Sequence, residues 1–256
     1  MLFIYFIIAT CATILGSLAG LGGGIIIKPV LDTIGNYNLS TVGILSSVTV
    51  FSMALVSTIE HFKSGFKINC NIGILSIASI LGGGVGEKLF NLFLLFFKNQ
   101  NIGKGIQALI LISLLIFVLF KNKLPKYNIK NKSFIFIVGF FLGVIASFLC
   151  IGGGPINVAI LIMFFNFSTK NAAVSSVFII LLSQFSKLFL ISIESGFLSF
   201  DLSVLPVMII GGVLGGLLGA KLNQKLSNIY IDKIFNISVI CVILISIFNV
   251  YTAFKK

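Results

Sequence analysis

Long apolar runs separated by short polar loops dominate the pattern of this 256-residue chain. A first run covers 2–19, and a shorter apolar piece of about ten residues follows three consecutive glycines. Three longer runs come next, at roughly 41–60, 70–90 and 103–120, and the series recurs after mid-chain with runs at roughly 171–192, 202–221 and 233–254. Because about 20 apolar helical residues span ~30 Å of hydrocarbon, the pattern predicts an all-α polytopic membrane protein.

Composition supports this prediction. Hydrophobic residues make up 58% of the chain and charged residues only 9%, and the mean hydropathy is +1.17. A soluble protein of this size needs far more polar surface. The first run lacks a positively charged leading region and has a counterpart in mid-chain, so we expect a helix there rather than a cleaved signal peptide.

The second half of the chain repeats the first. "LAGLGGGIIIKPVL" (Leu18 to Leu31) aligns with "FLCIGGGPINVAIL" (Phe148 to Leu161). The blocks "SSV", "SGF" and "GGGVGEKL"/"GGLLGAKL" follow in the same order at an offset between about 129 and 133. We therefore expect one integral membrane domain made of a first repeat (1–120), a basic linker (121–132) and a second repeat (133–256).

Loop charge indicates how the two repeats are oriented. The net charge is +12, and every basic residue is lysine. If the chain turns back at each triple glycine, eleven loop lysines gather on one side of the membrane: Lys63, Lys67, Lys121, Lys123, Lys126, Lys130, Lys132, Lys170, Lys221, Lys225 and Lys233. The other side keeps Lys98, Lys104, Lys255 and Lys256 together with Asp32, Glu194 and Asp201. Positive loops stay cytoplasmic, so this split favours inverted repeats, with a cytoplasmic linker and both termini outside.

Each repeat is thus expected to hold a re-entrant hairpin, broken at its triple glycine, and three transmembrane helices. Broken helices of inverted repeats commonly meet at a substrate site near the bilayer midplane. Glycine permits a tight reversal, and the free N–H groups of the following short helix favour an anion. The alternative is that the small residues only allow close helix packing, which is our interpretation of the scattered glycines in 82–86 and 211–219.

Polar residues near the breaks complete the candidate site. Lys28 would either bind an anionic substrate or extend its amine to an interface, and Lys187, inside 171–192, raises the same question. The candidate substrate-binding residues are Gly22, Gly23, Gly24, Lys28, Ser46, Ser47, Gly152, Gly153, Gly154, Asn157, Ser175 and Ser176.

Other chemistries lack the residues they need. The four cysteines form no CxxC motif, and His61 is the single histidine, so we expect neither a metal site nor another cofactor. Intramembrane catalysis needs a Ser–His pair, an acidic pair or a metal, so we predict a protein that is not an enzyme, with a Ser–Lys dyad at Lys187 left open. Glu87, beside Lys88, is the one carboxylate within a predicted segment and is not a convincing proton site, which leaves uniport or coupling through the substrate's own proton. The lysines lie in loops between apolar runs, so we expect the lipid bilayer and no nucleic acid as a partner.

The duplicated motifs resemble the sulfite exporter TauE/SafE family of membrane permeases. The resemblance rests on "GLGGGIIIKPVL" and "CIGGGPINVAIL", on the "TVGILSSV" and "NAAVSSVF" blocks and on "GGGVGEKL"/"GGLLGAKL". It implies a multi-pass secondary carrier in the cytoplasmic membrane for a small inorganic or organosulfur anion such as sulfite, thiosulfate or a sulfonate. The family pattern carries over to the glycines of both breaks and to Pro29, whereas Pro155 comes earlier than the family's second proline. A passive anion channel is the alternative function.

Overall fold

Ten helices make up the computed structural model, which describes residues 2–97, 100–121, 123, 125–194, 196–197 and 200–255; no strand occurs in these ranges. The helices are α1 (Leu2–Ala19), α2 (Gly24–Ile34), α3 (Leu39–Lys63), α4 (Cys70–Phe96), α5 (Gln100–Leu119), α6 (Lys132–Phe148), α7 (Gly154–Phe165), α8 (Thr169–Glu194), α9 (Leu205–Lys225) and α10 (Asn228–Lys255). The predicted order of long and short apolar segments therefore corresponds to helices throughout. Ser195 of the repeated "SGF" block, and Lys98 and Lys256 of the charge count, lie outside the described residues.

Seven of these helices are long and apolar enough to cross a membrane: α1, α3, α4, α5, α8, α9 and α10. Helix α6 has 17 residues, while α2 and α7 have only 11 and 12. At a rise of 1.5 Å per residue, α2 and α7 each cover about half of the hydrocarbon core. Many large apolar side chains point outward from the long helices, which suits a surface surrounded by lipid rather than water.

Local sequence signals set several helix ends. The side chain of Asn38 caps α3 by accepting a hydrogen bond from the Thr41 N–H at 2.7 Å. Asn131 caps α6 in the same way through the Ser133 and Phe134 N–H groups. Pro155 lies in the first turn of α7, where its missing N–H leaves no helical hydrogen bond unmade.

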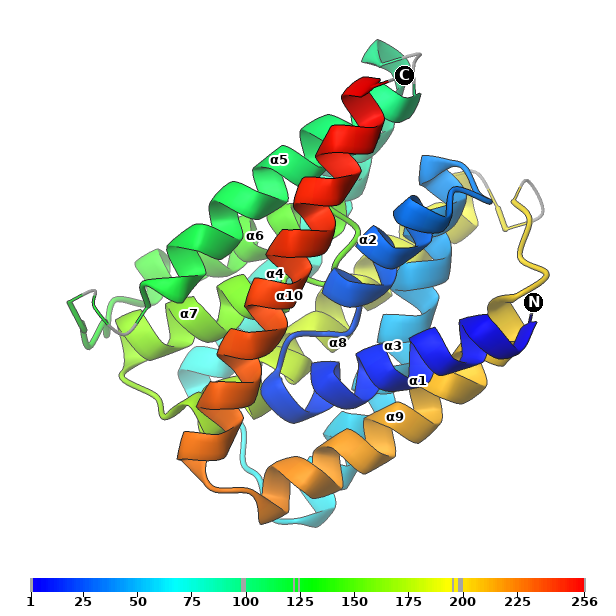
Figure 1. Cartoon of the computed structure of the whole chain (residues 1–256). Coiled ribbons are helices and arrows are strands. Elements are labelled where there is room, and N and C mark those ends of the chain that lie inside the picture. The colour runs from blue at the N-terminus through cyan, green and yellow to red at the C-terminus, as the bar shows by residue number, and fades with distance from the viewer. Residues whose placement is uncertain are drawn as a thin grey trace.

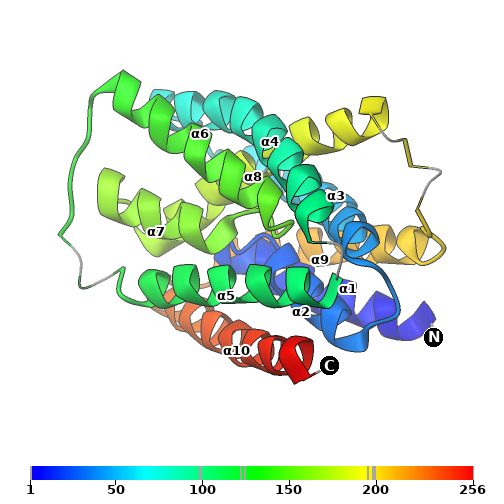
Figure 2. The same ribbon diagram turned by 90° about the horizontal axis from the view of Figure 1, so that it is seen from above.

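Equivalent helices of the two halves make matching contacts. Helix α1 packs along α9 as α6 packs along α4, and α3 packs on α9 as α8 packs on α4. Helices α5 and α10 lie side by side and run in opposite directions (Figures 1 and 2). Both ends of the chain lie on the side of the molecule opposite the 125–131 segment (Figure 2).

Glycines allow the α4–α6 and α1–α9 pairs to come close. A methyl group at Gly86 would overlap the Val144 carbonyl oxygen, and one at Gly219 would overlap the carbonyl oxygen of Ile14, which is 130 positions before Val144. Small residues at such crossings let helix backbones approach in a membrane, so these scattered glycines serve packing.

Candidate functional site

Two breaks in the helices lie at the centre of the molecule. The chain leaves α1 at Ala19 and begins α2 at Gly24, and Gly22 and Gly23 have φ angles of 84° and 66°. The second break repeats this conformation, with φ angles of 79° at Gly152 and 71° at Gly153 before α7 begins. Positive φ costs glycine little, which explains why the reversals use these residues.

The two breaks are in direct contact with each other. A Cβ at Gly24 would lie 2.9 Å from the Ile151 carbonyl oxygen, and a Cβ at Gly154 would overlap the carbonyl group of Leu21. Any side chain at either glycine would force the two main chains apart. The glycines therefore permit each reversal of the chain, and they also allow the main chains of the two breaks to come into contact.

Serines from the following long helices hold the breaks together. The Ser46 hydroxyl of α3 donates to the Cys150 carbonyl at 3.1 Å. The Ser176 hydroxyl of α8 reaches the Gly20 carbonyl at 2.8 Å and the Gly154 carbonyl at 3.3 Å. Each half thus clamps the break of the other.

The remaining polar candidates differ from these two serines. Ser175, which the repeated "SSV" block aligns with Ser46, instead donates to the Asn171 carbonyl of its own helix at 2.8 Å. The Ser47 hydroxyl and the Oδ1 atom of Asn157 are buried and have no hydrogen-bond partner among the described residues. These two atoms are free to bind a group that enters between the helices.

Lys28 is buried and paired. Its side chain extends from α2, is only 6% exposed, and its Nζ atom lies 2.9 Å from Oδ2 of Asp32, one turn later on the same helix. A carboxylate of its own helix therefore holds the lysine in this structure, and binding of an anionic substrate by Lys28 stays a prediction. The other carboxylate oxygen of Asp32, Oδ1, has no hydrogen-bond partner in the described part of the chain.

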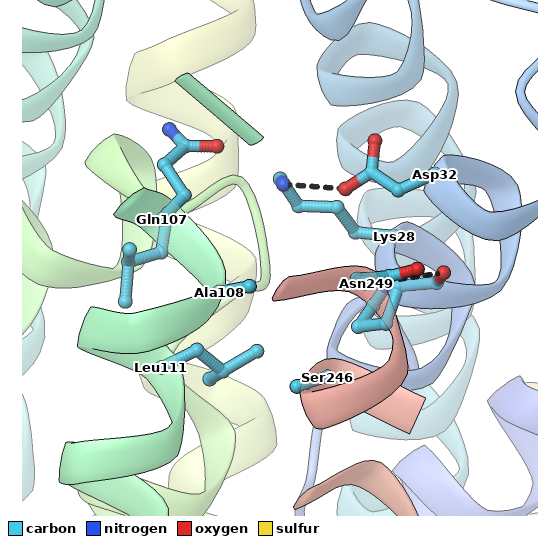
Figure 3. A pocket seen from close by; sticks show the side chains of 9 residues that line it. Lys28, Asp32, Gln107, Ala108, Leu111, Ser246 and Asn249 are labelled. Carbon is cyan, nitrogen blue, oxygen red and sulfur yellow. Dashed lines mark hydrogen bonds and ion pairs between the residues drawn. The ribbon is translucent and has the colours of Figure 1, made fainter. Parts of the chain in front are cut away.

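Lys28 and Asp32 line a niche of about 10 Å³, enough for roughly one water molecule. Figure 3 places Gln107 of α5 opposite the ion pair, and Ser246 and Asn249 of α10 beside it. Leu149, next to the second break, also lines this niche. The niche thus lies between α2, α5 and α10 and extends to the residue that follows α6.

A larger polar vestibule of about 410 Å³ adjoins the niche and shares Asp32 and Asn249 with it. It lies among the C-terminal ends of α2 and α10 and the N-terminal end of α5, and Lys104 is one of its lining residues. Because α10 ends there, the vestibule lies toward the side that carries the chain termini. A solute entering it meets the half-buried Lys104 before it reaches Lys28.

A second buried ion pair lies beside the second break. Nζ of Lys187 in α8 is 3.2 Å from Oε2 of Glu87 in α4, and it donates to the Cys150 Sγ at 2.9 Å and to the Ser147 carbonyl at 3.1 Å. A cavity of about 160 Å³ is lined by both members of the pair. Sequence reasoning noticed each residue but missed their pairing, because the two residues are 100 positions apart.

The described residues contain no group of three or more His, Cys, Asp or Glu side chains that could hold a metal ion. What the site offers is two buried ammonium groups, each held by a carboxylate, and small cavities next to both. Such an arrangement suits the binding of a small anion, because each ammonium can exchange its carboxylate for an incoming oxyanion.

Comparison with known proteins agrees with this description. The sequence pattern of the family described as "Sulfite exporter TauE/SafE" matches residues 5–246, nearly the whole chain. Searches of curated proteins and of solved structures found no match. The match covers both glycine breaks and the Lys28–Asp32 and Lys187–Glu87 pairs, and on this basis the chain belongs to the sulfite exporter TauE/SafE family, whose members are membrane permeases.

Proposed function

We propose that this protein is a secondary transporter of the cell membrane that carries a small anion, such as sulfite, thiosulfate or an organosulfonate, through a site where its two glycine breaks meet. One observation carries the proposal: Lys28 and Asp32 form a buried ion pair in a niche that adjoins a polar vestibule of about 410 Å³. Glycine at both breaks keeps main-chain N–H groups accessible to a ligand there.

We further propose that the two repeats are inverted. The opposite directions of α5 and α10, and the placement of both termini away from the linker, support this arrangement. The pairing of Val144 with Ile14 as the carbonyl contacts of Gly86 and Gly219 supports the equivalence of the two halves. Inverted repeats supply two related conformations that open to opposite sides, as alternating access requires.

A carrier fits the cavities better than a passive channel does. The vestibule of about 410 Å³ narrows to a niche of about 10 Å³ at Lys28, and the two breaks pack main chain against main chain. A channel needs a continuous wet path, whereas a carrier closes one side while it opens the other.

The test is counterflow in proteoliposomes, in which unlabelled internal anion exchanges for labelled sulfite, thiosulfate or an alkanesulfonate outside. We expect exchange of at least one of these anions, and a rate at least tenfold lower in Lys28→Gln, because a charge-assisted hydrogen bond to an anion contributes about 1.5–3 kcal/mol. Lys28→Gln also leaves Asp32 buried and unpaired. The double variant Lys28→Gln/Asp32→Asn therefore tests whether exchange is lost when no unpaired buried charge remains.

Lys88→Gln is the matched control, since Lys88 lies on the exposed face of α4. It should exchange anions like the wild type. Exchange at the wild-type rate in both Lys28 variants would remove Lys28 from the site, and the absence of exchange with all three anions in wild-type protein would contradict the proposed function.

A further inference from the structure

The ion pair of Glu87 and Lys187 joins three separate parts of the chain inside the membrane domain. Glu87 is 4% exposed and Lys187 is 1% exposed. The lysine ammonium bridges the Glu87 carboxylate at 3.2 Å and the Cys150 thiol at 2.9 Å, so it ties α4 and α8 to the second glycine break. Apart from this ion pair, Oε2 of Glu87 has no hydrogen-bond partner among the described residues.

The matching interface in the other half is built without ionisable groups. Positions 130 before Lys187 and Cys150 are Ser57 and Gly20, and the repeat aligns Glu87 with Ala220. There the Ser57 hydroxyl pairs with that of Ser17 at 2.7 Å, and Ser17 donates to the Gly216 carbonyl at 3.0 Å. The α1–α9 and α3–α9 contacts therefore form without a buried ion pair.

Packing thus gives no reason for the charges at Glu87 and Lys187. A buried ion pair is weak support for stability, because desolvation of both groups offsets much of their attraction. Ionisable residues inside a membrane domain more often serve a solute or proton pathway. The cavity of about 160 Å³ that both residues line, together with Ser40 and Asn91, provides space for a solute next to them.

Charge balance indicates what the pair does. The charged or titratable groups that face Glu87 are Lys187 from α8 and the Cys150 thiol at the end of α6, with Lys28 beyond Cys150. Lys88, the neighbour of Glu87 on α4, lies on the exposed face. Two lysines and two carboxylates, Asp32 and Glu87, make the region around the second break neutral, so an added monoanion would leave it with one uncompensated negative charge in a medium that solvates charge poorly.

We infer that Glu87 takes up a proton when the anion binds, so that the protein couples transport to protons in a symport. This inference rests on the proposed function. The Glu87 carboxylate gains one proton and becomes a neutral carboxyl, and the Lys187 ammonium moves its contact from that carboxylate to the incoming anion. One proton and one monoanion enter together, and the net charge of the site is unchanged.

The experiment uses an alkanesulfonate, which is fully ionised at neutral pH and therefore cannot carry the proton itself. Proteoliposomes acidified outside by one pH unit should accumulate the labelled anion about tenfold, since one pH unit corresponds to 1.36 kcal/mol for each proton carried. Glu87→Gln, which resembles the protonated carboxyl, should keep counterflow and lose accumulation. The control Glu194→Gln alters an exposed carboxylate at the end of α8 and should keep both activities.

A second measurement follows the proton directly. Adding the sulfonate to purified protein in weak buffer should raise the pH by an amount that corresponds to about one proton for each chain, and Glu87→Gln should show no uptake. If Glu87→Gln alone misfolds because Lys187 is stranded, Glu87→Gln/Lys187→Gln removes both charges and should also bind no proton.

The outcomes separate this inference from the function on which it rests. Accumulation or proton uptake that persists in the Glu87 variants would overturn the role of Glu87, as would wild-type counterflow that ignores the pH gradient, and both would leave the permease function intact. Absence of anion exchange in the wild type would overturn the permease function and this inference together.

Discussion

Gly154 is the first residue of α7 and lies against the Leu21 carbonyl group of the first break. A side chain at this position would overlap that carbonyl group. It begins α7 in the ordinary helical region rather than at positive φ. Its requirement for glycine is therefore a matter of space and not of backbone strain. Gly73 of α4 provides the contrast, because it is helical and has no atom within 4 Å of where its Cβ would lie.

Gly154→Ala should consequently reduce both stability and transport. Forcing a methyl group into a packed contact costs about 1–3 kcal/mol, and here it separates the two main chains that line the proposed site. We expect a lower thermal unfolding temperature and at least a tenfold slower counterflow. Gly73→Ala should be neutral or stabilising by about 0.5–1 kcal/mol, as expected for glycine replaced within a helix. Equal behaviour of the two variants would show that the breaks do not depend on their close contact.

At the scale of elements, the pairs α4–α6 and α1–α9 are built on the same plan. Gly82 faces the Phe140 carbonyl in one pair, and Gly215 faces the Thr10 carbonyl in the other. Phe140 and Thr10 are again 130 positions apart. The matched contacts give each pair a short distance between its helix axes, which small residues permit in a membrane.

Gly86→Ala and Gly219→Ala should therefore destabilise the protein to a similar extent. Each new methyl group would overlap a carbonyl oxygen, of Val144 or of Ile14, across the helix pair. A loss of about 1–3 kcal/mol for each is expected from overpacking, measured as a shift of the thermal unfolding temperature in detergent. A large loss in one variant with none in the other would contradict an equivalent role for the two helix pairs.

The order of helices could be predicted from the sequence because each helix corresponds to one apolar run of a defined length. Three glycines in a row oppose a continuous helix, so the sequence predicts a break at each triple glycine, and the re-entrant form of these breaks stays a prediction. The Lys28–Asp32 pair is one helical turn apart and was overlooked because Asp32 was assigned to a loop. The partner of Lys187 depended on how α4 packs on α8, which no local pattern contains.

At the scale of the whole molecule, the vestibule at Asp32 and the cavity at Glu87 lie toward the same side of the protein, the side of the chain termini. The vestibule at Asp32 lies at the end of α10, and the cavity at Glu87 is lined by Ser40 at the start of α3 and by Ile191 near the end of α8. The loop between α2 and α3 joins these two regions. The structure therefore has its polar access on the side of the termini, which the loop charges predict to be outside the cell.

Cysteine accessibility tests this orientation. In a variant with all four native cysteines replaced by serine, a cysteine introduced by Phe3→Cys should react with a membrane-impermeant thiol reagent added to intact cells. One introduced by Tyr127→Cys in the linker should react only after the membrane is opened. Phe3 and Tyr127 are 72% and 51% exposed, so burial would not explain a failure to react. Labelling of both residues from the same side would contradict the inverted arrangement.

The balanced pairs Lys28–Asp32 and Lys187–Glu87 also have a consequence for the energetics of the cycle. The membrane potential acts on net charge that moves, at about 2.3 kcal/mol for each elementary charge per 100 mV. When the empty protein changes from one access state to the other, these pairs carry equal charge of each sign. Voltage therefore neither drives nor opposes the return of the unloaded protein, and its rate should be the same in polarised and depolarised cells.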